Sequence, residues 1–500
     1  MPPPQLSPAI QTISNVRLHS TSSNPATYDL TLCNGHILHS IAPHSDPCPS
    51  RYPPPLALPA LTHPHIHLDK AYIHNSSTIH PQTGSFQEAL TLTTQAKSAF
   101  TEPDLHRRGE WLLSESILNG VTALRAFVEI DHTVHHKCLS TGIHLKNSWH
   151  NHCHIQLVAF AQDPLFSGPH APENRAILES AFAQHGDHID VLGVTPYVET
   201  DLDSAKQNIQ WAITTAWHLQ KHLDFHLDYH LDPAKGPLVW FVLRCLRDIG
   251  WTSSRSAKRV MFGHCSRLTL FHGDEWRRLR DEIGYDDNAL PVSFVGLPSS
   301  DLYMASPPPL PSPSLSSSSS LCCDSKGNTG IRDRVRGTLR LPELIRQYGF
   351  DVVLGVNNVG NAFTPWGSVD PISLACLGVG VYQAGTVEDA ELLYECVSTR
   401  ARAAIGLVED KNNNNNNNKS EEKEKKEEPS GGVSVREEDR ADLLLFYDVD
   451  ESGCGVVRPR RSVAEVVWDP PARMARAVVT GGRLVRRRAA LWDDEAFRFV

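Results

Sequence analysis

Two histidines, His65 and His67, stand two residues apart in the mostly apolar stretch LTHPHIHLD, and Asp69 follows two residues later. In an extended strand, residues two positions apart point to the same side. Three polar side chains would therefore share one side of this strand. Imidazole nitrogens are common ligands of zinc and iron, so the spacing indicates a divalent metal site. Because the chain has 26 histidines, the pair alone does not establish the site.

A second stretch, HLDFHLDYHLD, alternates in the same way. Its ionisable residues fall on one side of a strand, and its leucine and aromatic residues fall on the other. The ionisable residues are Asp224, His226, Asp228, His230 and Asp232. In a barrel the apolar row would pack against helices and the ionisable row would face the axis, where it must bind metal, pair or meet water. The alternative is a solvated edge strand.

Two other apolar runs end in polar residues that a barrel strand would present at its mouth. The run VMFGH ends at His264, and the run VVLGVNN ends at Asn357 and Asn358. A single histidine after an apolar strand is more often a core or loop residue than a functional one. His264 gains significance because it follows the other candidate histidines in chain order.

The segments between these residues alternate between strand-like and helix-like patterns. Seven apolar runs follow the HPHIHLD strand and are expected to form strands. They span residues 120–128, 154–162, 188–196, 222–232, 259–265, 291–298 and 350–358. Amphipathic segments such as DLHRRGEWLLSESILN and DSAKQNIQWAITTAWHLQKH lie between several of them. This gives about eight strand and helix units, which predicts an α/β fold of the (β/α)8 TIM-barrel type. A doubly wound sheet competes, but no glycine-rich phosphate turn follows the first strand.

Two segments lack the apolar residues that would offset the entropy cost of ordering. Residues 306–328 are rich in Ser and Pro, residues 411–432 are rich in Asn, Glu and Lys, and both are expected to be disordered insertions. Around them the chain divides into an N-terminal part, residues 1–57, a barrel domain, residues 58–405, and a C-terminal part, residues 433–500. Both end parts contain alternating strands with turn residues, and we expect them to form one small β-sandwich.

The composition is that of a globular protein, with 40% hydrophobic and 21% charged residues. The net charge of -10 argues against general nucleic-acid binding, and the short basic stretches RPRRS and LVRRRAA fit solvated strand ends or loops. The 11 cysteines include no C-x-x-C pair, which argues against a disulfide framework or a zinc ribbon. The N-terminus has no secretory pattern, and no apolar run reaches the roughly 18 residues needed to cross a bilayer. We therefore expect a cytoplasmic protein that binds neither membranes nor nucleic acid.

The order of these motifs resembles the cytosine deaminase-like branch of the amidohydrolase superfamily. The matching motifs are P-H-I-H-L-D, a later H-L-D, G-H, and L-G-x-N-N followed by FTPWG, with further matches in VAFAQ and FVGLPSSDLYM. The resemblance covers nearly the whole chain outside the two insertions and implies a metal-bearing barrel that hydrolyses C–N bonds in cyclic substrates. By this resemblance His65, His67 and His226 would bind the metal. His264 would contact the metal-bound water, and Gln162 would hold the substrate ring.

Two positions depart from the pattern of this branch. Tyr229 stands where its deaminases have a glutamate, and Asn357 stands where they have an aspartate after the eighth strand. The amide of Asn357 can offer an oxygen to the metal, but it cannot take a proton from water. Proton transfer would then fall to His264 or to Asp228. Lys70, directly after the HIHLD motif, is expected to face solvent.

The sequence therefore predicts a metal-dependent hydrolase that attacks a non-peptide C–N bond of a cyclic amidine, amide or aminated heterocycle with a metal-bound water. The expected cofactor is one divalent ion, zinc or iron, because imidazole suits both. The expected partner is a small-molecule substrate of unassigned identity, and a homo-oligomer stays open. The alternative, motivated by Tyr229 and Asn357, is a catalytically impaired protein of this fold that binds a small ligand without turnover.

Overall fold

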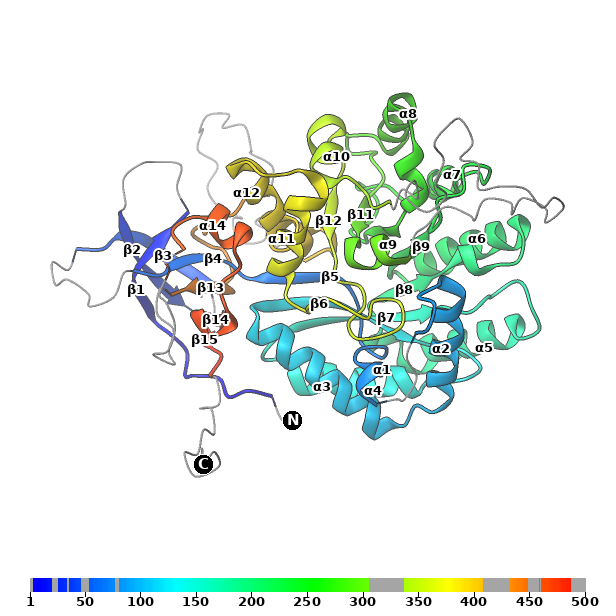
Figure 1. Ribbon diagram of the computed structural model, residues 1–500, viewed down its shortest axis with the longest axis horizontal. Coiled ribbons are helices and arrows are strands. Elements are labelled where there is room, and N and C mark those ends of the chain that lie inside the picture. Colours follow the sequence, from blue (N-terminus) through cyan, green and yellow to red (C-terminus); the bar gives the residue numbers. More distant parts are fainter. Residues whose placement is uncertain are drawn as a thin grey trace, which may run out of the picture.

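The computed structural model of the protein has two parts, a large barrel and a smaller sheet at one side of it (Figure 1). The structure describes residues 3–19, 26–33, 36–45, 54–76, 81–304, 337–407, 432–447, 458 and 460–486. The predicted insertion 306–328 lies outside the described residues, as does the predicted insertion 411–432 apart from Gly432.

The barrel is an eight-stranded sheet whose strands are parallel and follow one another in chain order. The strands are β5 (Leu61–His67), β6 (Val121–Glu129), β7 (His154–Ala161), β8 (Val191–Val194), β9 (His222–Leu227), β10 (Val260–His264), β11 (Val292–Gly296) and β12 (Val352–Leu354). Main-chain hydrogen bonds just beyond β12 join the last strand to the first. The His67 N–H donates to the Asn357 carbonyl over 2.8 Å, and the Asn357 N–H donates to the His65 carbonyl over 3.1 Å. The predicted (β/α)8 barrel is confirmed.

Helices surround the barrel strands (Figure 1). They are α1 (Ile73–Ser76), α2 (Phe86–Ser98), α3 (Glu102–Leu118), α4 (Lys137–Trp149), α5 (Ala171–His185), α6 (Leu202–His218), α7 (Val239–Ile249), α8 (Gly273–Ile283), α9 (Pro298–Met304), α10 (Leu341–Tyr348), α11 (Pro371–Tyr382), α12 (Val387–Glu395) and α13 (Thr399–Ala404), with short 3-10 turns η1 (Gly186–His188), η2 (Pro196–Val198) and η3 (Ser266–Leu270). Two of the predicted amphipathic helices begin at capping residues. Thr101 and Asp201 accept hydrogen bonds from the third amide of α3 and of α6, which satisfies donors that a helix start leaves unpaired.

The predicted strand at residues 222–232 is shorter than its alternating pattern suggests. It ends at Leu227, because Asp228 adopts a left-handed backbone conformation with φ of 50° and turns the chain out of the sheet. Asp224 and His226 remain inside the strand and are fully buried. The prediction that the whole ionisable row faces the barrel axis is therefore wrong beyond His226.

The strands from the two chain ends come together beside the barrel, as predicted. They are β1 (Thr12–Leu18), β2 (Thr27–Cys33), β3 (His36–Pro43), β4 (Leu56–Pro59), β13 (Leu443–Phe446), β14 (Arg476–Thr480) and β15 (Arg483–Leu484), with helix α14 (Val463–Trp468) and the turn η4 (Arg473–Ala475) beside them in the chain. β4 pairs with both β1 and β13. The described strands are thus hydrogen-bonded edge to edge into a single seven-stranded sheet, where two facing sheets were expected.

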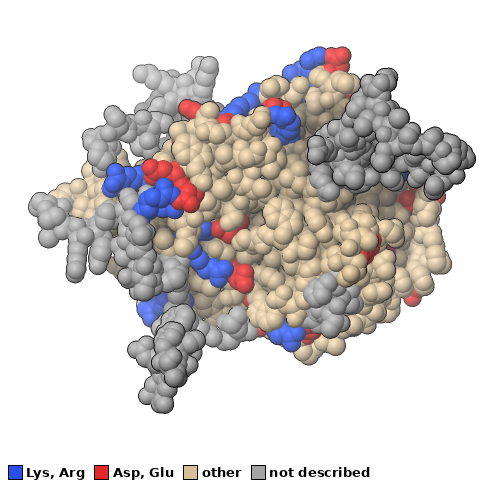
Figure 2. Space-filling model, in the orientation of Figure 1, with Lys and Arg blue, Asp and Glu red and all other residues tan. Residues whose placement is uncertain are grey.

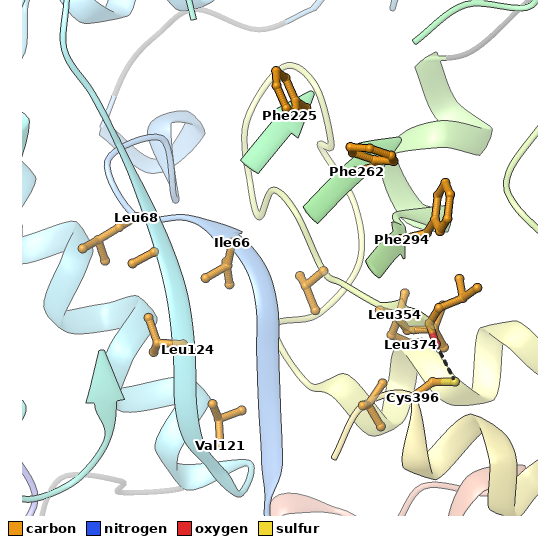
Figure 3. Close-up of a cluster of buried hydrophobic side chains, with 14 of the residues drawn as sticks. Ile66, Leu68, Val121, Leu124, Phe225, Phe262, Phe294, Leu354, Leu374 and Cys396 are labelled. Carbon is orange, nitrogen blue, oxygen red and sulfur yellow. Dashed lines mark hydrogen bonds between the residues drawn. The ribbon is translucent and has the colours of Figure 1, made fainter. Parts of the chain in front are cut away.

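The main hydrophobic core lies between the barrel and its helices. Phe225, Phe262 and Phe294 come from the neighbouring strands β9, β10 and β11 and lie in a row, with ring centroids 6.1 Å and 5.4 Å apart (Figure 3). They belong to the same buried cluster as Leu243 and Leu246 of α7. Because side chains alternate along a strand, packing these rings outward directs their neighbours toward the barrel axis.

The described part of the chain holds no helix that is both long enough and apolar enough to cross a membrane. On the face shown in Figure 2, positive and negative side chains of the described residues lie in small mixed groups, and no broad basic stripe is visible there.

Candidate metal centre and active site

The predicted metal ligands and His264 come from the carboxyl ends of four barrel strands. His65 and His67 lie at the end of β5, His226 lies near the end of β9, and His264 is the last residue of β10. Asn357 follows β12 at the seam that closes the barrel. His264 and Asn357 both have φ of 66°, so the chain turns sharply where each side chain enters the site. In TIM barrels this end of the strands carries the active site.

The side chains of His65, His67 and His226 meet at one point inside the barrel mouth. One ring nitrogen from each lies within 4.8 Å of the others, and the Nε2 atoms of His67 and His226 are 3.2 Å apart. Both nitrogens of His65 and the Nδ1 atoms of the other two have no hydrogen-bond partner among the described residues. Burial holds the pKa of all three imidazoles well below its usual value, so they are neutral. Neutral imidazoles with unshared nitrogens suit zinc or iron, and the residues therefore fit the implied ion.

Asn357 supplies an oxygen to the same site. Its Nδ2 donates to the Ser300 hydroxyl over 2.8 Å, and its Oδ1 is buried without a hydrogen-bond partner among the described residues. The Ser300 hydroxyl is also 2.6 Å from the Thr364 hydroxyl. This anchoring of the nitrogen leaves the oxygen as the atom that faces His65 and His67.

A buried carboxylate orients His264. The Nδ1 atom of His264 lies 2.9 Å from Oδ1 of Asp301. The other oxygen of Asp301, Oδ2, accepts hydrogen bonds from the Leu297 N–H and the Thr338 hydroxyl. A proton on Nδ1 is held by Asp301, and Nε2 is left to exchange a proton with a ligand in the cavity. The ring of Tyr229 stacks on His264 with centroids 3.8 Å apart. Asp301 lies in the quoted stretch FVGLPSSDLYM, but sequence reasoning did not single it out.

A cavity of about 270 Å³, part of it open to solvent, is lined by two of the three histidines, His67 and His226. His264 and Asn357 also line it, and the remaining lining residues are Lys70, Gln162, Tyr197, Tyr229, Asn358 and Phe363. The structure thus places Gln162 in the wall of this cavity, and its substrate-binding role stays a prediction.

Lys70 corrects one expectation. Instead of facing solvent, its side chain is 2% exposed and reaches the cavity. Its Nζ pairs with Oε1 of Glu129 at 2.6 Å and donates to Oε1 of Gln162 over 3.3 Å. Sequence spacing alone could not reveal this, because Glu129 is on the next strand, β6.

Asp228 corrects a second expectation. Its two carboxylate oxygens accept from the N–H groups of Leu238 and Val239 at the start of α7, over 2.8 Å and 3.1 Å, and it does not line the cavity. Burial raises the pKa of this carboxyl to about 6, although the two amides oppose the rise. The structure gives Asp228 a helix-anchoring position in place of the predicted role in proton transfer.

Removing this anchor should affect stability and leave the site intact. We expect Asp228→Ala to lower the free energy of unfolding by about 1–3 kcal/mol, because two buried N–H groups lose their acceptors. Asp228→Asn, which keeps one acceptor oxygen, should lose less. Denaturant titration and metal content of both variants check this. Loss of metal without a change in the free energy of unfolding would mean that Asp228 does have a role in the metal site.

A buried ion pair lies beside one of the three histidines, His65. Arg125 of β6 lies with Nη1 3.3 Å from Oδ2 of Asp224, and both side chains are fully buried. Oδ1 of Asp224 lies 3.8 Å from Nδ1 of His65. Burial raises the pKa of Asp224 to about 7, although Arg125 opposes the rise. Carboxylates behind ligand histidines commonly fix the ring orientation, and Asp224 occupies such a position.

Comparisons with known proteins agree with this fold. No protein-family model matches the chain, and no curated protein matches it. Among solved structures, a 5-methylcytosine deaminase from Klebsiella pneumoniae is similar with a TM-score of 0.71 and 18% identity, covering 96% of this chain and 98% of that one. An N-isopropylammelide isopropylaminohydrolase from Burkholderia multivorans gives 0.64 and 20%, covering 95% and 97%. An adenosine deaminase from Xanthomonas campestris with bound zinc gives 0.59 and 15%, covering 99% and 97%. The chain therefore has the fold of these deaminases and amidohydrolases over nearly its whole length.

Proposed function

We propose that this protein is a metal-dependent hydrolase that cleaves a non-peptide C–N bond in a cyclic amidine, amide or aminated heterocycle. The observation that carries the proposal is the group of three buried imidazoles with unshared nitrogens at the barrel mouth. The fold shared with proteins named as deaminases, one of them with bound zinc, supports it.

The proposal assigns each residue a task. His65, His67 and His226 would hold one divalent ion, zinc or iron, with Oδ1 of Asn357 as a further ligand. When bound, such an ion acts as a Lewis acid that makes water acidic and polarises the C–N carbon. Gln162 would bind the substrate ring.

His264 is assigned the proton transfers. Its Nε2 would take a proton as water attacks and return it to the departing nitrogen, while Asp301 stabilises the charged ring through Nδ1. Asn357 cannot serve as this base, and burial keeps the pKa of Tyr229 well above its usual range, so its phenol stays protonated.

A second candidate function is ligand binding without turnover. It is favoured by Tyr229 and Asn357, which stand where the deaminases resembled by the sequence have acidic groups. Both residues line the cavity. A barrel with these side chains could keep the ligand pocket while lacking the chemistry.

One experiment separates the two candidates. The purified protein, with metal content measured by elemental mass spectrometry, is tested for ammonia or amine release from cytosine, related aminoheterocycles and cyclic amides. Turnover that a chelator removes and zinc or iron restores supports the hydrolase. A metal-loaded protein that binds these rings and releases nothing supports the binding protein.

Restoring a carboxylate at position 357 should increase the rate. We expect Asn357→Asp to raise turnover, by as much as about 100-fold, because a carboxylate can both bind the ion and take a proton. Asn358→Asp is the matched control, since it adds the same charge to the cavity from a neighbouring amide. A lower rate for Asn357→Asp alone would mean that the amide is an adapted part of this site.

A further inference from the structure

We infer that the cavity selects a ring that carries negative charge on its oxo groups, and that Lys70 is the residue that recognises this charge. The inference names the substrate class of the hydrolase proposed above and rests on that proposal. In the reaction, water would replace the amino group of such a ring with an oxygen, and the nitrogen would leave as ammonia or an amine.

Lys70 is a buried ammonium that borders the cavity. Nζ contacts Glu129 and Gln162, and it lies 5.4 Å from the ring centre of Phe160 and 5.6 Å from that of Phe363. An ammonium has three N–H donors, and these two polar partners use two of them. One donor remains for a ligand.

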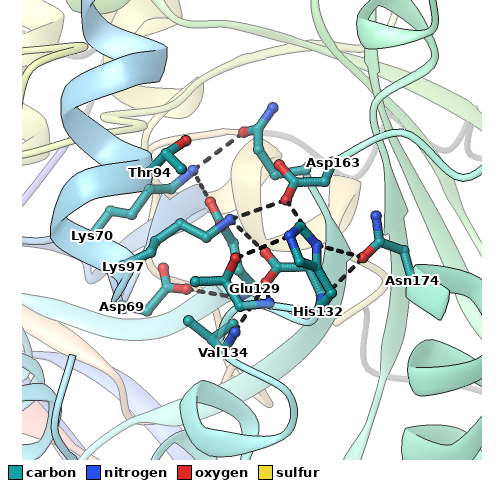
Figure 4. A network of polar contacts seen from close by, with 12 residues as sticks. Asp69, Lys70, Thr94, Lys97, Glu129, His132, Val134, Asp163 and Asn174 are labelled. Atoms are coloured by element: carbon teal, nitrogen blue, oxygen red, sulfur yellow. Dashed lines mark hydrogen bonds and ion pairs between the residues drawn. The ribbon is translucent and has the colours of Figure 1, made fainter. Parts of the chain in front are cut away.

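Among the described residues Lys70 has one ion-pair partner, and it shares that partner with a second lysine. Glu129, its ion-pair partner, is shared with Lys97 of α2, whose Nζ lies 2.5 Å from Oε2 (Figure 4). Lys97 also contacts Asp131 and lies 3.5 Å from Asp163, whereas Lys70 has no second ion-pair partner among the described residues. The carboxylates of this network therefore gather around Lys97, behind the cavity.

In the same network, Lys97 occupies the place that a second metal ion would take. Asp131, His132 and Asp163 lie close enough together to hold an ion. Lys97 already places its ammonium beside both carboxylates. The surrounding carboxylates hold the pKa of Lys97 well above its usual value despite burial, so a cation is already present.

The cavity wall offers donors and no opposing negative charge. Among the described residues that line it, none carries a carboxylate. The side-chain oxygen of Gln162 accepts a hydrogen bond from Lys70. The amide NH2 of Gln162 therefore lies near the Tyr197 hydroxyl. Beside Lys70 a ligand therefore meets an ammonium, an amide NH2 and a phenol, each of which can donate a hydrogen bond, and negative charge on the ligand strengthens each of these bonds. An oxo-substituted ring that ionises near neutral pH has this chemistry.

The test compares two rings that differ in charge. Barbiturate is a six-membered oxo ring that is an anion at neutral pH, and uracil is a neutral ring of similar size. Calorimetry on the metal-loaded protein at pH 7 should show barbiturate binding at least about 10-fold more tightly than uracil. Lys70→Met should weaken barbiturate binding by about 10- to 100-fold and change uracil binding little.

The lysine variant suits this test because it leaves no buried charge alone. In Lys70→Met, Glu129 keeps its ion pair with Lys97. Lys70→Gln, which retains a donor to Gln162, provides a second variant, and metal content reports that each is folded. Lys146→Met removes an ammonium that pairs with Asp190 outside the cavity and should change neither affinity.

The outcomes separate this inference from the proposed function. Binding is measured without turnover, so lysine-dependent preference for barbiturate supports the inference even if no hydrolysis is found. Barbiturate binding that survives both Lys70 variants but is lost in His65→Ala/His67→Ala overturns it, because the ion alone would then bind the anion. A parent protein that hydrolyses neutral cytosine with a higher kcat/KM than aminated oxo rings that are anions at pH 7 also overturns it and leaves the hydrolase in place.

Discussion

Replacing His65 and His67 together with alanine is expected to remove the metal and the activity in one step. The purified protein should contain about one zinc or iron per chain. Loss of two of three imidazole ligands should weaken metal affinity by more than about 100-fold, since loss of an outer contact alone costs about 10- to 100-fold. Elemental mass spectrometry after gel filtration measures the change, and the same sample shows whether any C–N hydrolysis remains.

His63 provides a matched control within the same strand. It has the same two-residue spacing as the ligands, but the register of β5 against β6 shifts between His63 and Ile66. Its Nε2 therefore meets the Ser116 hydroxyl of α3 at 3.2 Å. His63→Ala should keep the metal. Equal metal content in the double variant and the parent protein would contradict the proposed centre.

The second large effect is expected from His264. We expect His264→Ala to lower kcat by about 10²- to 10⁴-fold, because a positioned proton carrier contributes that much. The metal should be retained, since His65, His67 and His226 are untouched. Steady-state kinetics on the best substrate from the screen, with metal content measured in parallel, checks both parts.

Asp301→Asn refines this prediction. It should leave the position of His264 nearly unchanged while removing the charge that stabilises its protonated ring, so the pH profile of kcat should shift to lower pH. If His264→Ala lost the metal as well, His264 would be a ligand. If kcat stayed the same in both variants, another group would move the proton.

Much of the barrel could be predicted because its strands are short apolar runs bounded by polar residues. The predicted runs at 120–128 and 291–298 correspond to β6 and β11 with small changes at their ends. The run at 222–232 failed at its end for a local reason. Alternation continues past Leu227, but Asp228 is fixed by two amides of α7, a contact that no pattern within the strand encodes.

The candidate ligands could be predicted, whereas their supporting residues could not. His65 and His67 share a strand, so their spacing alone places them together. Asp301 and Lys70 act through partners on other elements, His264 and Glu129, which only the folded chain brings near. A buried lysine and a solvent-facing lysine look the same in sequence when the paired carboxylate lies on another strand.

The seam that closes the barrel has a consequence for the order of folding. Its two sides are the first and last barrel strands, so joining the His65 and His67 backbone to Asn357 closes a loop that contains most of the barrel domain. Loop closure costs entropy that grows with loop length, and contacts between distant segments form slowly. The site is therefore complete only after the last barrel strand, β12, has been synthesised and the segment that follows it has paired with β5. A chain that stops before Asn357 would carry all four site histidines and still lack the closed mouth in which they meet.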